Sequence, residues 1–427
     1  MTGLARSRAE HAIARAAALD PAQRRAIFTE FSPDRIRAEA DALDARARAG
    51  ETMPLYGLTV SIKDLFDEAG QVTSAGSRLL ADAPPAAADS TPVARLKAAG
   101  ALCAGRTSMS EFAYSGVGLN PHHGTPESSL GGGMMPGGST SGGAVAVGLG
   151  ITDAALGSDT GGSCRIPAAA NRLWGFKPTQ AMVPAQGTHP LAPSYDTVGV
   201  IARHLNDTAA LFAALSGTDA AGDAAEAPLA LAVPSGAFTN DMDPDTTAFF
   251  DAAQAALRDA GHRLVRVDLG DMDAALWVNR VIVSHEALAR YRGDLDRLET
   301  LGDPRVLARI RFALTLDEAE IARAHATRRD IVARFAAALE WADALVCPTL
   351  PEPPPTIAAV EADFDRLNAR MLRNPSLVNL ADGCALAMPA GTGAQSLMIA
   401  APAGADRRLL AVARRLEHDR IVGADAP

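Results

Sequence analysis

A serine that follows two glycines is the first residue of this sequence that could carry out a reaction. Ser163 stands in the stretch GSDTGGSCRIPAA. A nucleophilic serine needs a base within hydrogen-bond reach, and N–H donors for the oxyanion that forms when it attacks a carbonyl. Glycines let backbone N–H groups approach a ligand closely, so the amides of Thr160, Gly161, Gly162 and Ser163 suit an oxyanion hole. The same stretch also suits a tight turn in which Ser163 caps a helix starting at Arg165.

Two further features offer the groups that such a serine needs. Ser139 lies in PGGSTSGGA, which has its own double glycine, and Lys63 follows an apolar strand pattern in SIKDLFD. Burial would lower the pKa of Lys63 and let its neutral amine act as a base, although a lysine at a strand end is more often a solvated charge. Together, a buried lysine and two glycine-flanked serines predict a serine hydrolase that does not use histidine.

Other reactive groups have weaker support. The sequence contains neither G-x-x-x-x-G-K-[ST] nor G-x-S-x-G, which argues against a phosphate-binding loop and a nucleophile elbow. Cys164 is expected to be a small apolar filler rather than a nucleophile. No histidine has a recognisable partner, and surface or satisfied polar roles are expected for His122, His123, His189 and His204.

Alternating strands and helices are expected to position these residues, as in an α/β sheet. A strand from Leu58 to Ile62 ends at Lys63, and residues 114–143 form a loop much longer than the usual connection of about 4–6 residues. Helices are predicted at TPVARLKAAGA, from Gly142 to Leu149, from about Asp245 to Ala260, over most of 271–341, and from about Ala405 to His418. Further strands are predicted at LCAGRT, Ala154–Ser158, Leu229–Val233, HRLVRVDL, ADALVCPTL, CALAMP and SLMIAAP.

Composition narrows the classes of partner. The 427 residues are 48% hydrophobic and carry a formal charge of −10, which fits a globular protein and disfavours nucleic acid and anionic lipid as partners. No apolar run approaches the roughly 18 residues that span a bilayer, and the N-terminus lacks the apolar region of a secretory signal. Four scattered cysteines show no metal-binding spacing. We therefore expect a cytoplasmic protein without a metal site.

The serine-rich region as a whole resembles the defining region of the amidase signature family, on GGSTSGGAVAVGLGITDAALGSDTGGSCRIPAAANRLWGFKPT. The resemblance extends to LYGLTVSIKDLFDEAGQVTSAGS, GRTSMSEFAYS, SYDTVGVIARHLNDTAAL, ALVCPTLPEPP and NPSLVNLADGCALAMPAG, and covers most of residues 50–420. It implies one α/β/α domain over residues 1–427, with a mixed central β-sheet flanked by helices. The Ala-, Arg- and Glu-rich sequence predicts a helical N-terminal segment 1–50. The other expected parts are a signature core 51–215, a variable segment 216–345 and a C-terminal return 346–427.

The resemblance also implies a Ser-cisSer-Lys triad. In that scheme Ser163 is the nucleophile, Ser139 relays the proton after a cis peptide bond from Gly138, and Lys63 is the base. An acyl-enzyme forms and is hydrolysed by water, and no metal or organic cofactor takes part.

Several positions near the serines depart from the family pattern, and others are expected to have structural rather than catalytic roles. Thr140, Ser141 and Gly143 differ from its usual residues, and a relay through Ser141 stays open. Asp159 and Arg165 are expected to form a structural ion pair or loop brace. Tyr114, Met109 and Trp174 could line a pocket, but buried packing is the simpler expectation for them.

The implied activity is cleavage of a linear carboxamide, a small molecule, to a carboxylic acid and ammonia or an amine. Two alternatives remain: an A-subunit-like component of a tRNA-dependent amidotransferase, and an allophanate- or carboxybiuret-type hydrolase. The latter would need an arginine in its pocket, for which Arg290, Arg292 and Arg311 are candidates. Specificity is expected to come from residues 114–135 and 270–345. A homodimer is compatible with the sequence.

Overall fold

The computed structural model describes residues 3–218, 224–226, 228–270 and 273–423, so a few positions of the predicted variable segment and C-terminal return lie outside the described residues. Within these ranges eleven strands form one sheet in the order β1-β3-β2-β4-β6-β5-β10-β11-β9-β7-β8. The strands are β1 (Phe28–Glu30), β2 (Thr59–Lys63), β3 (Leu102–Thr107), β4 (Ala154–Ser158), β5 (Trp174–Lys177), β6 (Val198–Ala202), β7 (Ala230–Pro234), β8 (Arg263–Val267), β9 (Ala344–Pro348), β10 (Cys384–Pro389) and β11 (Ser396–Ala401).

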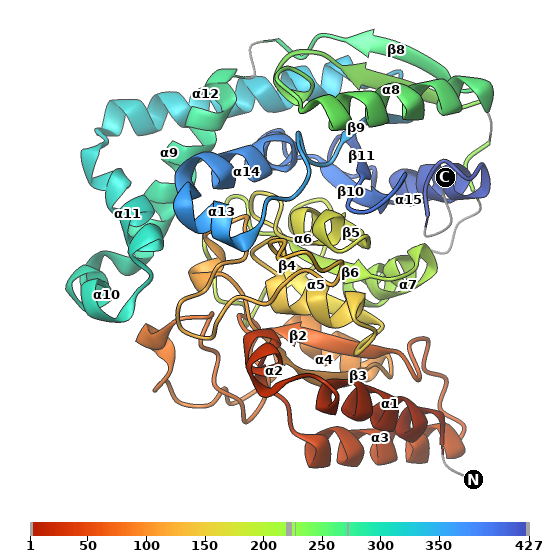
Figure 1. The fold of residues 1–427 in the computed structure, drawn as a ribbon, viewed down its shortest axis with the longest axis vertical. Helices are drawn as coiled ribbons and strands as arrows, with labels where there is room; N and C mark the ends of the chain where they lie inside the picture. Colours follow the sequence, from red (N-terminus) through yellow and green to blue (C-terminus); the bar gives the residue numbers. More distant parts are fainter. Residues whose placement is uncertain (1–2, 219–223, 227, 271–272, 424–427) are drawn as a thin grey trace.

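The sheet is mixed, as predicted. Strand β2 runs parallel to β3 and β4, and β7 runs parallel to β8 and β9, while the other neighbouring pairs are antiparallel. Strands β10 and β11, from the end of the chain, lie in the middle of the sheet and join its two parallel groups (Figure 1).

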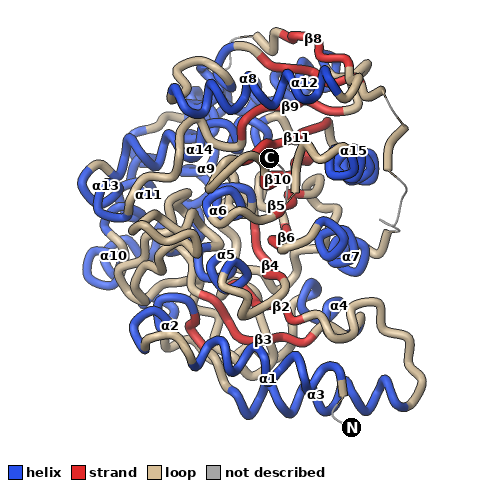
Figure 2. Tube along the Cα trace, turned by 45° about the vertical axis from the view of Figure 1, so that its right-hand side comes forward, coloured by secondary structure: helices blue, strands red, loops and turns tan. Residues whose placement is uncertain are grey.

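Helices cover both faces of this sheet (Figure 2). Helices α4, α7 and α15 lie on one side, and α5, α6 and α14 lie on the other, which confirms the predicted α/β/α arrangement. The described α-helices are α1 (Leu4–Ala17), α2 (Pro21–Ile27), α3 (Pro33–Arg48), α4 (Thr91–Ala98), α5 (Ser141–Gly148), α6 (Arg165–Ala170), α7 (Leu205–Ser216), α8 (Pro244–Asp259), α9 (Asp273–Tyr291), α10 (Leu295–Leu301), α11 (Pro304–Phe312), α12 (Glu318–Ala338), α13 (Ile357–Ala362), α14 (Phe364–Leu380) and α15 (Asp406–His418).

Several helices begin with the same local device, a short polar residue followed by proline. In α11, the Asp303 carboxylate accepts a hydrogen bond from the Arg305 N–H at 2.9 Å, and Pro304 occupies the first turn. Proline has no N–H to leave unsatisfied there, and its fixed φ suits the helix start. The same pattern starts α2, α3 and α8.

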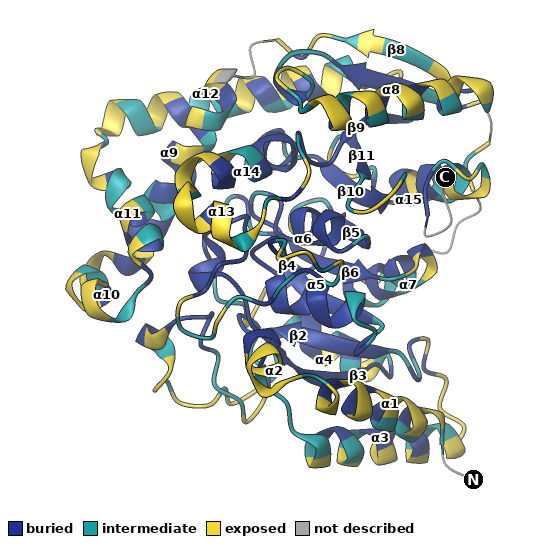
Figure 3. Ribbon diagram, viewed as in Figure 1, coloured by how far each residue is buried: buried dark blue, intermediate teal, exposed yellow. Residues whose placement is uncertain are grey.

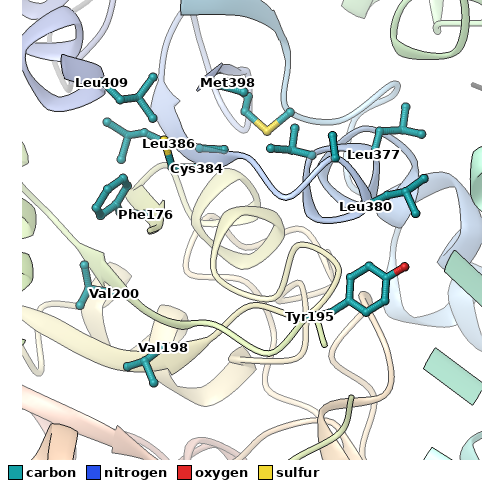
Figure 4. Packing of buried hydrophobic residues seen from close by; sticks show 14 of the residues in the cluster. Phe176, Tyr195, Val198, Val200, Leu377, Leu380, Cys384, Leu386, Met398 and Leu409 are labelled. Atoms are coloured by element: carbon teal, nitrogen blue, oxygen red, sulfur yellow. The ribbon is translucent and has the colours of Figure 1, made fainter. Parts of the chain in front are cut away.

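The core joins the two halves of the chain. Phe176 of β5 and Val200 of β6 pack in one cluster with Leu386 of β10 and Leu409 of α15 (Figure 4). The central strands are buried along their length, whereas α1, α3, α10 and α12 present exposed faces (Figure 3). The central strands therefore form a rigid support for the residues at their ends.

Three expectations need correction. The N-terminal segment 1–50 is not entirely helical, because β1 pairs with the edge of β3. Strands β5 and β6 are not among the elements predicted from the sequence. Ser163 is not a helix cap: Cys164 precedes the first residue of α6, and no side chain caps that helix.

Candidate active site

The ends of two neighbouring parallel strands place the predicted base, Lys63, beside Ser158. Lys63 is the last residue of β2 and Ser158 is the last residue of β4, and Ile62 lies beside Leu156 in the ladder. Parallel strands end at the same edge of a sheet. The side chains of Lys63 and Ser158 therefore meet there.

Lys63 is fully buried and makes two hydrogen bonds. Its Nζ donates to Ser139 Oγ at 2.8 Å and to Ser158 Oγ at 2.8 Å. Burial lowers the pKa of Lys63 to about 8, and the negative charges of Asp159 and Asp196 recover only part of the shift. A sizeable fraction of the amine is then neutral near physiological pH and able to accept a proton.

Ser139 reaches Lys63 from the loop before α5. The peptide bond between Gly138 and Ser139 is cis. Gly138 is tightly enclosed, since a Cβ there would lie 2.5 Å from the Gly118 nitrogen and 2.7 Å from the Ser115 oxygen. The next residue, Thr140, donates its N–H to the Ser163 carbonyl at 3.4 Å. The two serine loops are therefore in direct contact.

The loop that carries Ser163 is fixed by Asp159. Its carboxylate accepts hydrogen bonds from the N–H groups on both sides of Ser163, at 2.8 Å from Gly162 and 3.1 Å from Cys164. Arg165 donates to the same carboxylate from Nε at 3.0 Å and Nη2 at 2.8 Å, and both side chains are fully buried. Burial raises the pKa of Asp159, but the charge and hydrogen bonds of Arg165 outweigh it and hold that pKa well below its usual range. The predicted ion pair is confirmed.

The contacts of Asp159 with Gly162, Cys164 and Arg165, here called the Asp159 brace, change the predicted set of oxyanion donors. The N–H of Gly162 is engaged by Asp159, which removes it from that set. For the N–H groups of Thr160, Gly161 and Ser163, the described residues contain no hydrogen-bond acceptor. The Ser163 hydroxyl likewise has no hydrogen-bond partner among the described residues, although Ser163 is buried.

The histidines among the remaining candidates contact other residues, and the other candidates serve packing. His122 Nε2 contacts Glu111 at 3.0 Å, and His189 Nε2 contacts the Tyr291 hydroxyl at 2.6 Å. Burial raises the pKa of Cys164, which keeps this thiol protonated. Met109, Tyr114 and Trp174 belong to the main hydrophobic core.

Sequence reasoning missed three contributors. Ser158 is the second partner of Lys63, and the Asn379 amide donates to Asp159 Oδ1 at 2.9 Å. Glu111 accepts hydrogen bonds from Ser77 Oγ at 2.7 Å and from the Asp303 N–H at 2.6 Å, and so ties a loop to the start of α11. Only Ser158 had a usable signal, because it ends a predicted strand next to the one that ends at Lys63.

The described residues hold neither a metal-ligand cluster nor a membrane-spanning helix. No three His, Cys, Asp or Glu side chains within them are grouped as ligands for a metal ion. Among the described helices, none is both long enough and apolar enough to traverse a bilayer.

Comparisons with known proteins agree with this fold. The family model described as Amidase matches residues 9–410. The chain is 36% identical to 2-amino-5-chloromuconic acid deaminase of Comamonas testosteroni over 404 residues, which cover 90% of this chain and 86% of that protein. Over 193 residues, 45% of this chain and 42% of the other, it is 42% identical to the 1-carboxybiuret hydrolase subunit AtzE of Pseudomonas sp. (strain ADP).

A solved structure described as "Crystal structure of amidase" superimposes with a TM-score of 0.88 at 29% identity, and the match covers 97% of this chain and 95% of that one. The chain belongs to the amidase signature family and is an amidohydrolase that acts on carbon–nitrogen bonds.

Proposed function

We propose that this amidohydrolase cleaves a linear carboxamide to a carboxylic acid and ammonia or an amine, through a Ser-cisSer-Lys triad and an acyl-enzyme. The observation that carries the proposal is the hydrogen bond of 2.8 Å between the fully buried Lys63 amine and the Ser139 hydroxyl. A buried amine with a pKa of about 8 is a competent general base near neutral pH.

The first half-reaction forms a C–O bond, breaks the C–N bond and moves one net proton from Ser163 to the leaving nitrogen. Neutral Lys63 takes the proton of Ser139, Ser139 takes that of Ser163, and the Ser163 oxygen bonds to the amide carbon. The carbonyl oxygen becomes an oxyanion, which the N–H groups of Thr160, Gly161 and Ser163 stabilise. The relay then protonates the leaving nitrogen as the C–N bond breaks.

Water completes the cycle. The neutral lysine accepts a proton from water through the same relay, the water oxygen bonds to the acyl carbon, and the bond to Ser163 breaks as Ser163 regains its proton. The fixed Asp159 brace supports this step because it holds the amides on either side of Ser163 in place throughout.

A second candidate is hydrolysis of an allophanate- or carboxybiuret-type ureide. The local identity of 42% with a carboxybiuret hydrolase subunit favours it. An A-subunit-like role in an amidotransferase would require a partner protein, and co-purification tests that alternative. The homodimer also stays a prediction, which light scattering tests.

The test is ammonia release from aliphatic and aryl amides, glutamine, malonamate and allophanate. We expect Ser163→Ala, Ser139→Ala and Lys63→Ala each to lower kcat by about 10³-fold or more. Ser141→Ala is the matched control, because Ser141 Oγ is buried without a hydrogen-bond partner in the described structure. Full activity of Ser163→Ala would refute the proposal, and loss in Ser141→Ala but not in Ser139→Ala would move the relay to Ser141.

A further inference from the structure

The segment that leads into β6 contacts the loop of the proposed nucleophile. Residues 191–197, here called the strap, run directly into this strand (Figure 4). The Thr197 carbonyl of the strap accepts the N–H of Asp159 at 2.8 Å, and the Asp196 carboxylate accepts a hydrogen bond from the Thr160 hydroxyl at 2.6 Å. The strap therefore continues the antiparallel pairing of β6 with β4 into the nucleophile loop.

The carboxylate of Asp196 is itself held in one orientation. Its Oδ2 accepts the N–H of Leu191 at 2.9 Å and that of Ala192 at 3.1 Å, while the Asp196 N–H donates to the Ala192 carbonyl at 2.8 Å. The oxygen that Thr160 reaches is Oδ1. A hydroxyl bonded to a carboxylate at this distance makes a charge-assisted hydrogen bond, which is stronger than a neutral one.

Two helices hold the strap from its other side. Glu286 of α9 accepts the Ser194 N–H at 3.0 Å and also the Ser194 hydroxyl. Arg328 of α12 donates from Nη2 to the Ser194 carbonyl at 3.0 Å, and its guanidinium carbon lies 3.9 Å from the centroid of the Tyr195 ring. Both helices belong to the predicted variable segment, so the strap joins that segment to the nucleophile loop.

These contacts bear on one peptide group, the one between Asp159 and Thr160, which carries the Thr160 N–H. The strap holds it on both sides, through the Asp159 N–H and through the Thr160 hydroxyl. The Thr160 N–H itself has no acceptor among the described residues, and Thr160 is buried. A donor that is fixed in direction before the substrate arrives is what an oxyanion site requires.

We infer that Asp196 is a positioning residue of the reaction: through the Thr160 hydroxyl it keeps the Thr160 N–H directed at the oxygen on which the oxyanion forms. The inference rests on the proposed function, since it concerns the oxyanion donors of the same site. Asp196 acts through Thr160 and not on the substrate. Because the negative charge develops only in the transition state, loss of this positioning should lower kcat more than it changes KM.

The first variant removes only the hydroxyl that Asp196 holds. Thr160→Val keeps the size and β-branching of the side chain, and we expect kcat for the best amide of the panel to fall about 10- to 100-fold while KM changes less than about threefold. Thr160→Ser keeps the hydroxyl and should retain kcat within about threefold. Thr152→Val is the matched control, because Thr152 is a buried threonine whose hydroxyl has no hydrogen-bond partner in the described structure.

A double variant tests whether Asp196 acts through Thr160. Asp196→Asn should lower kcat less than Thr160→Val, since an amide oxygen can still accept the Thr160 hydroxyl. The double variant should have a kcat close to that of Thr160→Val alone, because both changes act on one contact. Losses that multiply in the double variant would mean that Asp196 acts by another route, and would overturn the inference.

An inhibitor gives a readout that a merely structural role would not move. Ser163 should add to the aldehyde that matches the best amide: a C–O bond forms, the π electrons move to the carbonyl oxygen, the serine proton passes to the relay, and no group leaves. We expect the Ki of this aldehyde to rise in Thr160→Val by the same factor as kcat/KM falls. Each variant is assayed after its unfolding curve shows it to be folded. A fall in kcat with an unchanged Ki would overturn the inference.

Two outcomes separate this inference from the proposed function. If Ser163→Ala loses activity while Thr160→Val keeps that of the wild type, the inference fails and the amidase proposal stands. If the wild type hydrolyses nothing in the panel, the linear-amide proposal fails, and phenylmethanesulfonyl fluoride becomes the probe: the Ser163 oxygen bonds to sulfur, fluoride leaves and the proton passes to the relay. Labelling of Ser163 at least tenfold slower in Thr160→Val than in Thr152→Val would support the inference, and equal rates or no labelling would overturn it.

Discussion

Ser158 accepts a hydrogen bond from Lys63 that is as short, at 2.8 Å, as the one between Lys63 and Ser139. The lysine is therefore held between two hydroxyls that come from different parts of the chain, one at the end of β4 and one in the loop before α5. The first of these contacts lies outside the proposed proton relay. Its expected role is to orient the amine and to set its pKa.

Replacing Ser158 by Ala should lower kcat about tenfold, because Lys63 loses one of its two anchors. An acceptor bonded to an ammonium group favours the charged form, so its loss should also lower the pKa of Lys63. The acid limb of the pH profile would then move to lower pH. Ser61→Ala is the control, since Ser61 lies on the same strand as Lys63 and its buried hydroxyl has no hydrogen-bond partner in the described structure. An unchanged profile in Ser158→Ala would contradict this role.

The pH dependence of kcat/KM should report the titration of Lys63. The pKa of this amine is lowered from 10.5 to about 8 by burial, and only the neutral form accepts a proton from Ser139. Activity should rise about tenfold per pH unit below pH 8 and level off above it. The profile is measured with one amide between pH 5.5 and 10. A rate that does not change between pH 6 and 8 would argue against Lys63 as the base.

The Asp159–Arg165 pair should be strongly coupled in stability. Arg165→Met leaves a buried carboxylate without its cation, which should cost about 3–5 kcal/mol in the free energy of unfolding. Adding Asp159→Asn removes the stranded charge and should recover part of that loss. Urea denaturation of the wild type, both single variants and the double variant gives the coupling energy. Additive effects would show that the two residues act independently.

The cysteines should be unreactive in the folded protein. All four are buried, and burial raises the pKa of each thiol. Because the thiolate is the reactive form, a disulfide reagent at pH 7.5 should label none of them rapidly and all four after unfolding in guanidinium. Cys164→Ala should retain activity within about threefold, as expected of a packing residue. Rapid labelling of Cys164 that abolishes activity would reopen its role as a nucleophile.

Much of the site could be predicted from local sequence. Lys63, Ser139 and Ser163 each stand at a place with a readable physical signal, namely the end of an apolar strand or a double glycine. The strand Ala154–Ser158 has the predicted bounds, and the last helix begins one residue from its predicted start. These features depend on neighbours in sequence, which a single chain displays.

The parts that could not be predicted depend on distant contacts. The three residues of β1 form a strand only because β3 offers an edge beside them. The Gly162 N–H donates a hydrogen bond to Asp159 because the chain turns back after Asp159. The identity of residue 159 alone does not predict that turn.

The central place of β10 and β11 has a consequence for the growing chain. During synthesis, β2 to β6 can assemble early, but β5 keeps an open edge and β9 has no neighbour on one side until residues 384–401 emerge. Domains built on such long-range pairing fold late and expose strand edges meanwhile. Pro375 and Asn379, which hold Arg165 and Asp159, leave the ribosome in the same late stretch. The loop around Ser163 thus acquires these supports only after residues 375–379 have emerged, so a shorter nascent chain carries the serine motif before its loop is fully braced.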